Sequence, residues 1–95
     1  MATYVILSQI QPGAFGEPKD FKMLAKDVSG TIKEQCPGIN WKYSYATTGR
    51  FDVVDVVESD SPAEVEKAAM IIRSHGHAVT ETMVATPWNE FLDAL

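Results

Sequence analysis

The sequence predicts an α+β fold with a four-stranded antiparallel sheet and two helices on one face of it. Three observations predict this fold. Four short runs are rich in Val, Ile, Tyr and Thr, as strands are, and two longer segments carry apolar residues at helical spacing. The order of these segments is β-α-β-β-α-β. At 95 residues, the chain has room for one core, so residues 1–95 are expected to form a single domain.

The first third of the chain predicts a strand, a loop and a helix. Residues 3–10 form an apolar run rich in Val and Ile, which indicates a strand. Residues 11–18 contain two Gly and two Pro, which indicates a loop. Phe15 within this loop is expected to fold back onto the core, and a lid or an interface plug is the alternative. Residues 19–35 have an apolar stripe at helical spacing, and the helix must end by Cys36 because Pro37 and Gly38 follow.

The middle of the chain predicts a hairpin. Residues 41–47 alternate in polarity, and this alternation places Trp41, Tyr43 and Tyr45 on one face of a strand. A tight connection at 48–50 leads into a third strand, residues 51–58.

The last third predicts a capped helix, a strand and a tail. Ser61 is a suitable N-cap before Pro62, and Glu64 would complete a capping box. Gly76 is a natural helix stop. Residues 77–86 are rich in Val and Thr and predict the fourth strand, and the final segment WNEFLDAL predicts a short helix.

These elements predict the ferredoxin-like arrangement, in which two right-handed crossovers place the first and third strands at the centre of the sheet. Both helices then cover one face and leave the other face open. Because the strands are rich in apolar residues, the open face would expose a large apolar surface to water, which is unusual in a monomer. We therefore expect a homodimer in which two sheets face each other.

Composition limits the classes of partner. The net charge is −5, the pI is about 4.8, and only eight Lys and Arg are present. Nucleic acid and anionic membranes need clustered basic residues, so neither is expected as a partner. A lone cysteine cannot form a disulfide within the chain, and no signal peptide or membrane-spanning run is visible, so we expect a cytoplasmic protein.

The chain resembles the GYD domain family. TTGRFDVVDVVES, residues 47–59, resembles the Gly-x-Tyr-Asp signature of that family, with Phe51 in place of Tyr. ATYVILSQ resembles the family's opening strand, SPAEVEKAAMII its second helix, and TETMVATPWNEFLDAL its final strand and acidic-aromatic tail. This resemblance implies a ferredoxin-like fold of the dimeric α/β-barrel type, and it implies little chemistry.

The same turn is also similar to one in the ligand-sensing domain of the leucine-responsive regulators. In those regulators the turn lies near an oligomer interface that binds small effectors. This sequence contains no DNA-binding helix-turn-helix, so the similarity implies only a stand-alone sensing or assembly role.

Two acids in the signature stretch are candidates for ligand binding. Asp52 is expected to accept hydrogen bonds from N–H groups of the turn at 48–51, and a polar handle for a ligand is the alternative. Asp55 lies inside a strand, where aspartate is disfavoured. Alternation predicts that Val54 and Val56 face the helices and that Asp55 faces the dimer interior, lining a cavity or pairing with Lys42.

The remaining candidates lie near the last strand. His75, His77 and Glu81 are residue types that bind metal, but no metal motif accompanies them. Asp55 and Glu81 are predicted to flank a pocket roughly 10 Å apart, two strand spacings, which would suit proton transfer. Asp55, His77 and Glu81 are therefore the catalytic candidates.

Three functions remain open at this point. The first is a small homo-oligomeric module that binds a ligand or assembles, with Asp52, Asp55, Tyr43 and Tyr45 as ligand-binding candidates. The second is a cofactor-free enzyme of the dimeric-barrel kind, resembling monooxygenases or transferring protons. The third is a metal-binding protein that uses His75, His77 and Glu81. No phosphate loop or other cofactor motif is present, and no ligand is identified.

Overall fold

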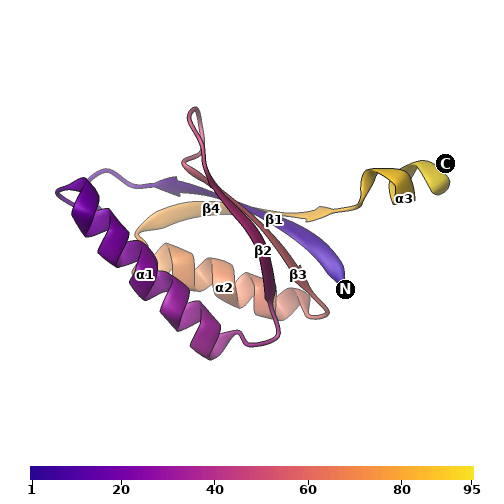
Figure 1. Ribbon diagram of the computed structural model, residues 1–95, viewed down its shortest axis with the longest axis horizontal. Coiled ribbons are helices and arrows are strands. Elements are labelled where there is room, and N and C mark those ends of the chain that lie inside the picture. The colour runs from indigo at the N-terminus through magenta and orange to yellow at the C-terminus, as the bar shows by residue number, and fades with distance from the viewer.

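The computed structural model describes residues 1–95 and confirms the predicted order of elements, with a short helix at the C-terminus (Figure 1). The elements are β1 (Ala2–Ile10), α1 (Pro18–Gln35), β2 (Asn40–Ala46), β3 (Val53–Ser59), α2 (Pro62–His75), β4 (Ala78–Ala85) and α3 (Trp88–Asp93). None of the helices has the length and apolar character needed to cross a membrane.

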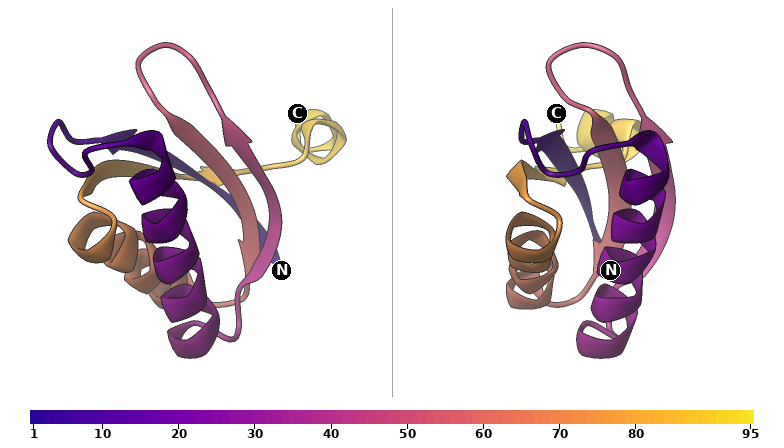
Figure 2. Two further views of the ribbon diagram at one scale, coloured as in Figure 1. Left: turned by 60° about the vertical axis from the view of Figure 1, so that its left-hand side comes forward. Right: turned by 90° about the vertical axis from the view of Figure 1, so that its left-hand side faces the viewer.

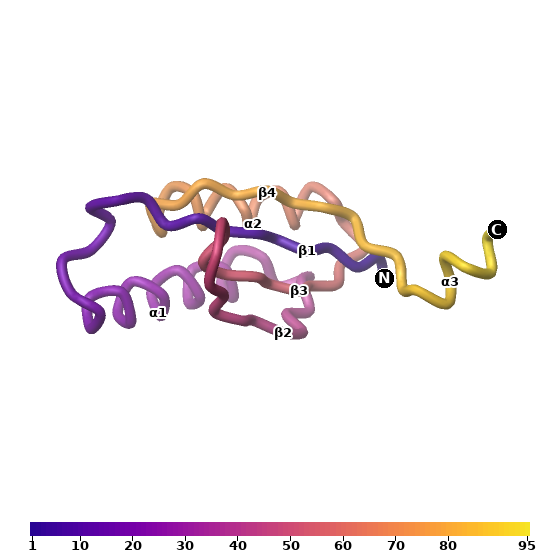
Figure 3. The backbone as a smooth tube through the Cα atoms, turned by 90° about the horizontal axis from the view of Figure 1, so that it is seen from above, coloured from indigo at the N-terminus to yellow at the C-terminus, as the bar shows by residue number.

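The four strands form one antiparallel sheet in the order β2-β3-β1-β4, as predicted (Figure 3). The two central strands are aligned so that Ile6 of β1 lies opposite Asp55 of β3, and Ile6 lies opposite Thr82 of β4 on its other side. Helices α1 and α2 lie on the same side of the sheet, and the other side carries no helix (Figure 2).

The core lies mainly between the central strands and α2. Ile6 and Val57 of the sheet are fully buried, and so are Val65 and Ala68 of α2. Small Ala side chains allow α2 to approach the sheet closely. Helix α1 runs along α2 and adds Ile32 to this cluster. The tightly packed region is therefore under α2, and the sheet next to α1 is less filled.

A β-bulge in β2 changes the predicted faces of the hairpin. Trp41 lies opposite Val57, but Tyr43 lies opposite the adjacent residue Val56, so one residue of β2 is unpaired between them. Trp41 consequently faces the helices, whereas Tyr43 and Tyr45 lie on the open face of the sheet. The prediction that these three aromatics share a face was wrong, because the extra residue reverses the alternation.

The N-terminus of α2 is capped in a different way from the predicted capping box. The Ser61 hydroxyl accepts the N–H of Glu64 at 3.2 Å, as predicted. The Glu64 carboxylate instead accepts the N–H of Gly38, at 2.9 Å, in the connection between α1 and β2. A side chain at position 38 would collide with this carboxylate. The start of α2 is therefore fastened to a distant loop.

The end of α2 has a left-handed residue that is not glycine. Gly76 ends the helix as predicted, and a Cβ there would lie 2.6 Å from the carbonyl oxygen of Ile72. The residue that follows, His77, has a φ of 51°, a conformation that L-residues seldom adopt. Its carbonyl oxygen accepts the N–H of Gln11 at 3.0 Å, which fixes the first loop beside β4.

Helix α3 stands away from the rest of the domain, beyond the end of β4 (Figures 1 and 3). Its Trp88 and Phe91 rings pack on each other with centroids 5.8 Å apart. Trp88 is 69% exposed, so this small aromatic pair is largely open to solvent.

Candidate functional site

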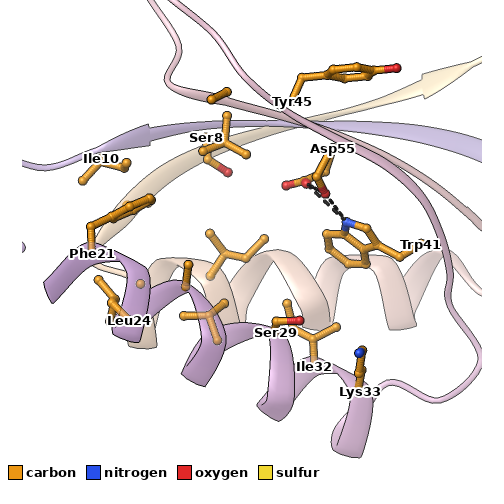
Figure 4. A pocket seen from close by; sticks show the side chains of 18 of the residues that line it. Ser8, Ile10, Phe21, Leu24, Ser29, Ile32, Lys33, Trp41, Tyr45 and Asp55 are labelled. Carbon is orange, nitrogen blue, oxygen red and sulfur yellow. Dashed lines mark hydrogen bonds between the residues drawn. The ribbon is translucent and has the colours of Figure 1, made fainter. Parts of the chain in front are cut away.

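A pocket of about 460 Å³ lies between α1 and the sheet (Figure 4). Of its 20 lining residues, 14 are hydrophobic, which is the composition expected of a small-molecule site. The predicted apolar stripe of α1 supplies one wall through Phe21, Leu24, Val28 and Ile32. All of these except Ile32 are only half-buried, because they face the pocket and not a packed partner.

The sheet supplies a polar floor to this apolar pocket, and Asp55 is its central residue. Asp55 is 6% exposed. Its Oδ1 accepts the Ser44 hydroxyl at 2.6 Å and the Trp41 indole N–H at 3.2 Å (Figure 4). The same indole N–H is 2.9 Å from Ser44 Oγ, so the three side chains form a closed cluster. Both donors are used on one carboxylate oxygen, which leaves Oδ2 without a donor from the chain.

The surroundings of Asp55 change its acidity. Burial raises the pKa of the Asp55 carboxyl above its usual range, and the hydrogen bonds from Ser44 and Trp41 oppose that rise only in part. A carboxyl group with a raised pKa in a pocket can exchange a proton under milder conditions than a surface acid.

Ser8 is the second polar residue of the floor. It is 3% exposed, and its Oγ is the one buried side-chain oxygen or nitrogen without a hydrogen-bond partner. A buried hydroxyl in this state costs about 1–3 kcal/mol. Ser8 follows Ile6 by two residues on β1, so it shares the helix-facing side of the sheet with Asp55. The floor therefore holds two polar groups with unused hydrogen-bonding capacity.

The position of Asp55 corrects its predicted face. Asp55 points toward the helices and not into a dimer interior, while Val54 and Val56 lie on the open face. Both sets of alternating residues in β3 are rich in Val, so alternation alone could not distinguish them. The bulge in β2 places the Trp41 donor on the helix side, where it stabilises the carboxylate. Lys42, the predicted partner of Asp55, instead forms an ion pair with Glu58, with 3.8 Å between Lys42 Nζ and Glu58 Oε1.

Asp52 accepts a backbone N–H, but its partner is not the predicted turn. Its Oδ2 accepts the N–H of Ile10 at 2.7 Å, and its own N–H donates to the carbonyl oxygen of Ser8 at 2.9 Å. These bonds tie the start of β3 to the end of β1. The turn uses a separate bond, from the Thr47 hydroxyl to the Phe51 carbonyl oxygen at 2.8 Å, and Gly49 supplies a φ of 122°.

Tyr43 and Tyr45 lie on the open face and do not reach the floor of the pocket. Their rings stack with centroids 6.2 Å apart, and each is more than half exposed. Tyr45 borders the pocket, but Figure 4 shows its ring on the opposite side of the strands from Asp55.

The other candidates are separated from Asp55 by the sheet or by distance along it. Glu81 lies opposite Leu7, and Asp55 lies opposite Ile6, so the two carboxylates point to opposite faces of the sheet. The predicted pair of acids flanking one pocket was therefore wrong. His75 and His77 are exposed beyond the pocket, and no three His, Cys, Asp or Glu side chains are placed to share a metal ion.

Ser8, Ser44 and Cys36 belong to the pocket and were missed in the sequence. The sequence held a signal for Ser8, because this small polar residue lies at the same alternating positions as Tyr4 and Ile6 and so shares their face of an otherwise apolar strand. The sequence held no such signal for Ser44, because the bulge in β2 determines which face of the sheet Ser44 lies on. Cys36 is 2% exposed, and burial raises the pKa of its thiol, so it lines the pocket as an apolar group.

Phe15 does not reach the core, contrary to expectation. Its ring packs on Phe21, with centroids 5.1 Å apart, and it is 36% exposed. Because Phe21 lines the pocket, the loop between β1 and α1 contacts the pocket wall through this pair.

Comparisons with solved structures identify the fold. A feast or famine regulatory protein from Mycobacterium tuberculosis, complexed with L-methionine, aligns with a TM-score of 0.62 and 14% identity over 92% of this chain and 51% of its own. This chain thus spans about half the length of that regulator. FFRP-DM1 aligns with a TM-score of 0.51 and 21% identity, over 90% of this chain and 100% of its own.

A third neighbour is an enzyme, the cofactor-independent oxygenase SnoaB from Streptomyces nogalater. It aligns with a TM-score of 0.50 and 14% identity over 92% of both chains. Identities this low establish a shared fold, which hosts regulators and an enzyme alike. No curated protein sequence matches this chain.

The family model named GYD domain matches residues 4–95. The match covers nearly the whole chain and includes the turn with Gly49 and Asp52, together with every element that forms the pocket. This protein therefore belongs to the GYD domain family.

Proposed function

We propose that this protein is a homodimeric module that binds a small apolar molecule in the pocket between α1 and the sheet. One observation carries the proposal: a pocket of about 460 Å³ with mostly apolar walls ends on a polar floor where Ser8 Oγ and Asp55 Oδ2 have no hydrogen-bond partner. Apolar walls with a few converging polar groups are typical of ligand sites.

The alternative to a ligand site is a packing defect, and the floor argues against it. Protein interiors are close-packed, so an unused space next to a helix would normally be filled by larger side chains. Here the residues beneath α1 include small or polar ones, Ser8, Ser44 and Asp55. Burial of Ser8 and Asp55 lowers stability, and a bound molecule that pairs with them would recover that loss.

The homodimer is supported by the open face of the sheet. Tyr43, Tyr45, Val79 and Met83 are exposed there, and no helix covers them. A second copy, sheet to sheet, would remove this apolar surface from water. The pocket lies within one chain, on the opposite side of the sheet, so the ligand would not sit between the two subunits.

An enzyme that transfers a proton through Asp55 is a second candidate. It is favoured by the raised pKa of the Asp55 carboxyl in a pocket. Of the three predicted catalytic residues, only Asp55 lines the pocket, because His77 and Glu81 lie outside it. This candidate predicts that a bound molecule is converted to a product detectable by mass spectrometry, and that Asp55→Asn stops the conversion. A ligand recovered unchanged would reject it.

Binding in the pocket is tested with a fluorescent naphthalene derivative, 2-methoxynaphthalene, and two variants of α1. Ala25 lines the pocket, and Ala25→Trp should fill it and abolish binding. Met23 is 70% exposed on the same helix and does not line the pocket, so Met23→Trp should bind as the wild type does. Equal binding to Ala25→Trp would reject the proposed function, and so would the absence of saturable binding of this compound and of its naphthalene analogues to the wild type.

A further inference from the structure

We infer that the pocket takes a neutral aromatic alcohol, a phenol or a naphthol, whose hydroxyl group bridges Ser8 Oγ and Asp55 Oδ2. The inference rests on the proposed function, since it names the class of molecule that the pocket would bind.

The register of the sheet sets the spacing of the two groups. Asp55 lies opposite Ile6, and Ser8 lies opposite Val53, so Ser8 and Asp55 are diagonal neighbours on one face. Diagonal neighbours in an antiparallel pair are roughly 7–8 Å apart at their Cα atoms. Short side chains do not meet across that distance, and Ser8 and Asp55 form no hydrogen bond. One ligand oxygen between them could contact both.

The unused capacities of the two groups specify a hydroxyl. Oδ2 of an ionised Asp55 can only accept a hydrogen bond, and the Ser8 hydroxyl has a hydrogen to donate. A ligand hydroxyl can donate to Asp55 and accept from Ser8 through the same oxygen. A ligand carboxylate would be repelled by Asp55. An ammonium group could donate to both oxygens, but its charge would have to be desolvated in a largely apolar pocket.

The walls favour a flat ring. Phe21 and Trp41 contribute aromatic rings, and Leu24, Val28 and Ile32 contribute branched aliphatic surface (Figure 4). Pockets of this size, in the range of roughly 300–1,000 Å³, hold small organic molecules. A one- or two-ring aromatic with a single hydroxyl matches both the walls and the floor.

The test compares three naphthalenes on the full chain by calorimetry at neutral pH: 2-naphthol, 2-methoxynaphthalene and 2-(aminomethyl)naphthalene. The methoxy compound has the acceptor but no donor, and the amine is a cation. We expect 2-naphthol to bind roughly tenfold more tightly than the methoxy compound, since a hydrogen bond to a charged group has about this effect. The amine should bind more weakly than 2-naphthol.

Two variants identify the floor. Asp55→Asn should reduce the preference for 2-naphthol over 2-methoxynaphthalene by several-fold, because only the naphthol can donate to Asp55. Ser8→Ala should weaken the binding of both compounds, because both offer an oxygen that accepts from Ser8. Ser8→Ala should also raise the melting temperature of the ligand-free protein, because it removes the unpartnered hydroxyl. Ser74→Ala makes the same chemical change outside the pocket and should leave the affinities for both compounds intact.

The outcomes separate this inference from the proposed function. If none of the three naphthalenes binds, the proposed function fails. If 2-naphthol and 2-methoxynaphthalene bind equally to the wild type, or the amine binds most tightly, the inference is overturned while the pocket remains a binding site. A preference for 2-naphthol that survives Asp55→Asn unchanged also overturns it, and so does a wild-type affinity for both compounds in Ser8→Ala. The wild-type comparison decides the matter even if a variant does not fold.

Discussion

The indole N–H of Trp41 donates a hydrogen bond of 3.2 Å to Oδ1 of Asp55, joining β2 to β3 on the side of the sheet that faces the helices. The bond depends on the bulge in β2, which turns Trp41 toward Asp55. It holds one carboxylate oxygen in place and leaves the other free toward the pocket. The Trp41–Asp55 pair thus connects an irregularity of the sheet to the chemistry of the proposed site.

Asp55→Asn is expected to stabilise the ligand-free protein at neutral pH. The pKa of Asp55 is raised by burial, so stability is fully present below the carboxyl pKa of the unfolded chain and falls as pH rises through the folded-state value. Asparagine keeps an oxygen for Ser44 and Trp41 and cannot ionise. Thermal melts should show a higher melting temperature for the variant at neutral pH and equal values in acid. A lower melting temperature at neutral pH would show that the charge is stabilising.

Trp41→Phe should weaken folding in a pH-dependent way. It removes a donor to a buried carboxylate, a bond worth about 1.5–3 kcal/mol to a charged partner. It also removes part of a large ring from the pocket wall, a loss that does not depend on pH. Urea unfolding should therefore show a larger loss of unfolding free energy at neutral pH than in acid. An equal loss at both would mean that the hydrogen bond to Asp55 contributes nothing measurable.

Asp52→Ala should destabilise the domain without altering the pocket. The carboxylate accepts the N–H of Ile10 at 2.7 Å, and no other side-chain acceptor reaches that N–H. We expect a loss of about 1–2 kcal/mol in unfolding free energy. The affinity for 2-methoxynaphthalene should stay at the wild-type value when both are measured below the melting transition. Lost affinity in a folded variant would return Asp52 to the list of ligand-binding residues.

His77→Gly should stabilise the domain, because His77 has a φ of 51° and glycine adopts that conformation without strain. Left-handed conformations cost non-glycine residues about 1 kcal/mol or more. We expect the free energy of unfolding of His77→Gly, measured with urea, to rise by nearly that amount, and we expect ligand binding to be unchanged. Loss of a catalysed reaction in this variant would instead place His77 in a site. The exposed His75 offers a control, since His75→Gly replaces a helical residue and should destabilise.

The homodimer predicts a mass of two chains in sedimentation at micromolar concentration, twice 10.5 kDa. Met83 is 44% exposed on the open face, and Met83→Lys should shift the mass toward a single chain. Met70 is 56% exposed on α2, so Met70→Lys is the matched control and should remain dimeric. A wild-type mass of one chain would reject the dimer.

The fold was predictable because its main signals are local. Apolar spacing identified α1, and Ser61 and Gly76 marked the ends of α2. The face of Asp55 was not predictable, because each alternating set of β3 contains two valines and the bulge in β2 carries no Gly or Pro that would mark it. The partners of Asp52 and Glu64 lie 42 and 26 residues away, and no local pattern encodes such contacts.

Nuclear magnetic resonance offers the most direct measurement of the central claim, which is that a small molecule binds between α1 and the sheet. The chain has two indole N–H groups, Trp41 in the pocket and Trp88 in the projecting α3, and they serve as a reporter and an internal control. Titration with 2-naphthol should shift the Trp41 indole signal together with the amides of Ser8 and Asp55, and leave Trp88 unchanged. Shifts confined to Trp88 or to Tyr43 and Tyr45 on the open face, or no saturable shift at Trp41, would contradict the account.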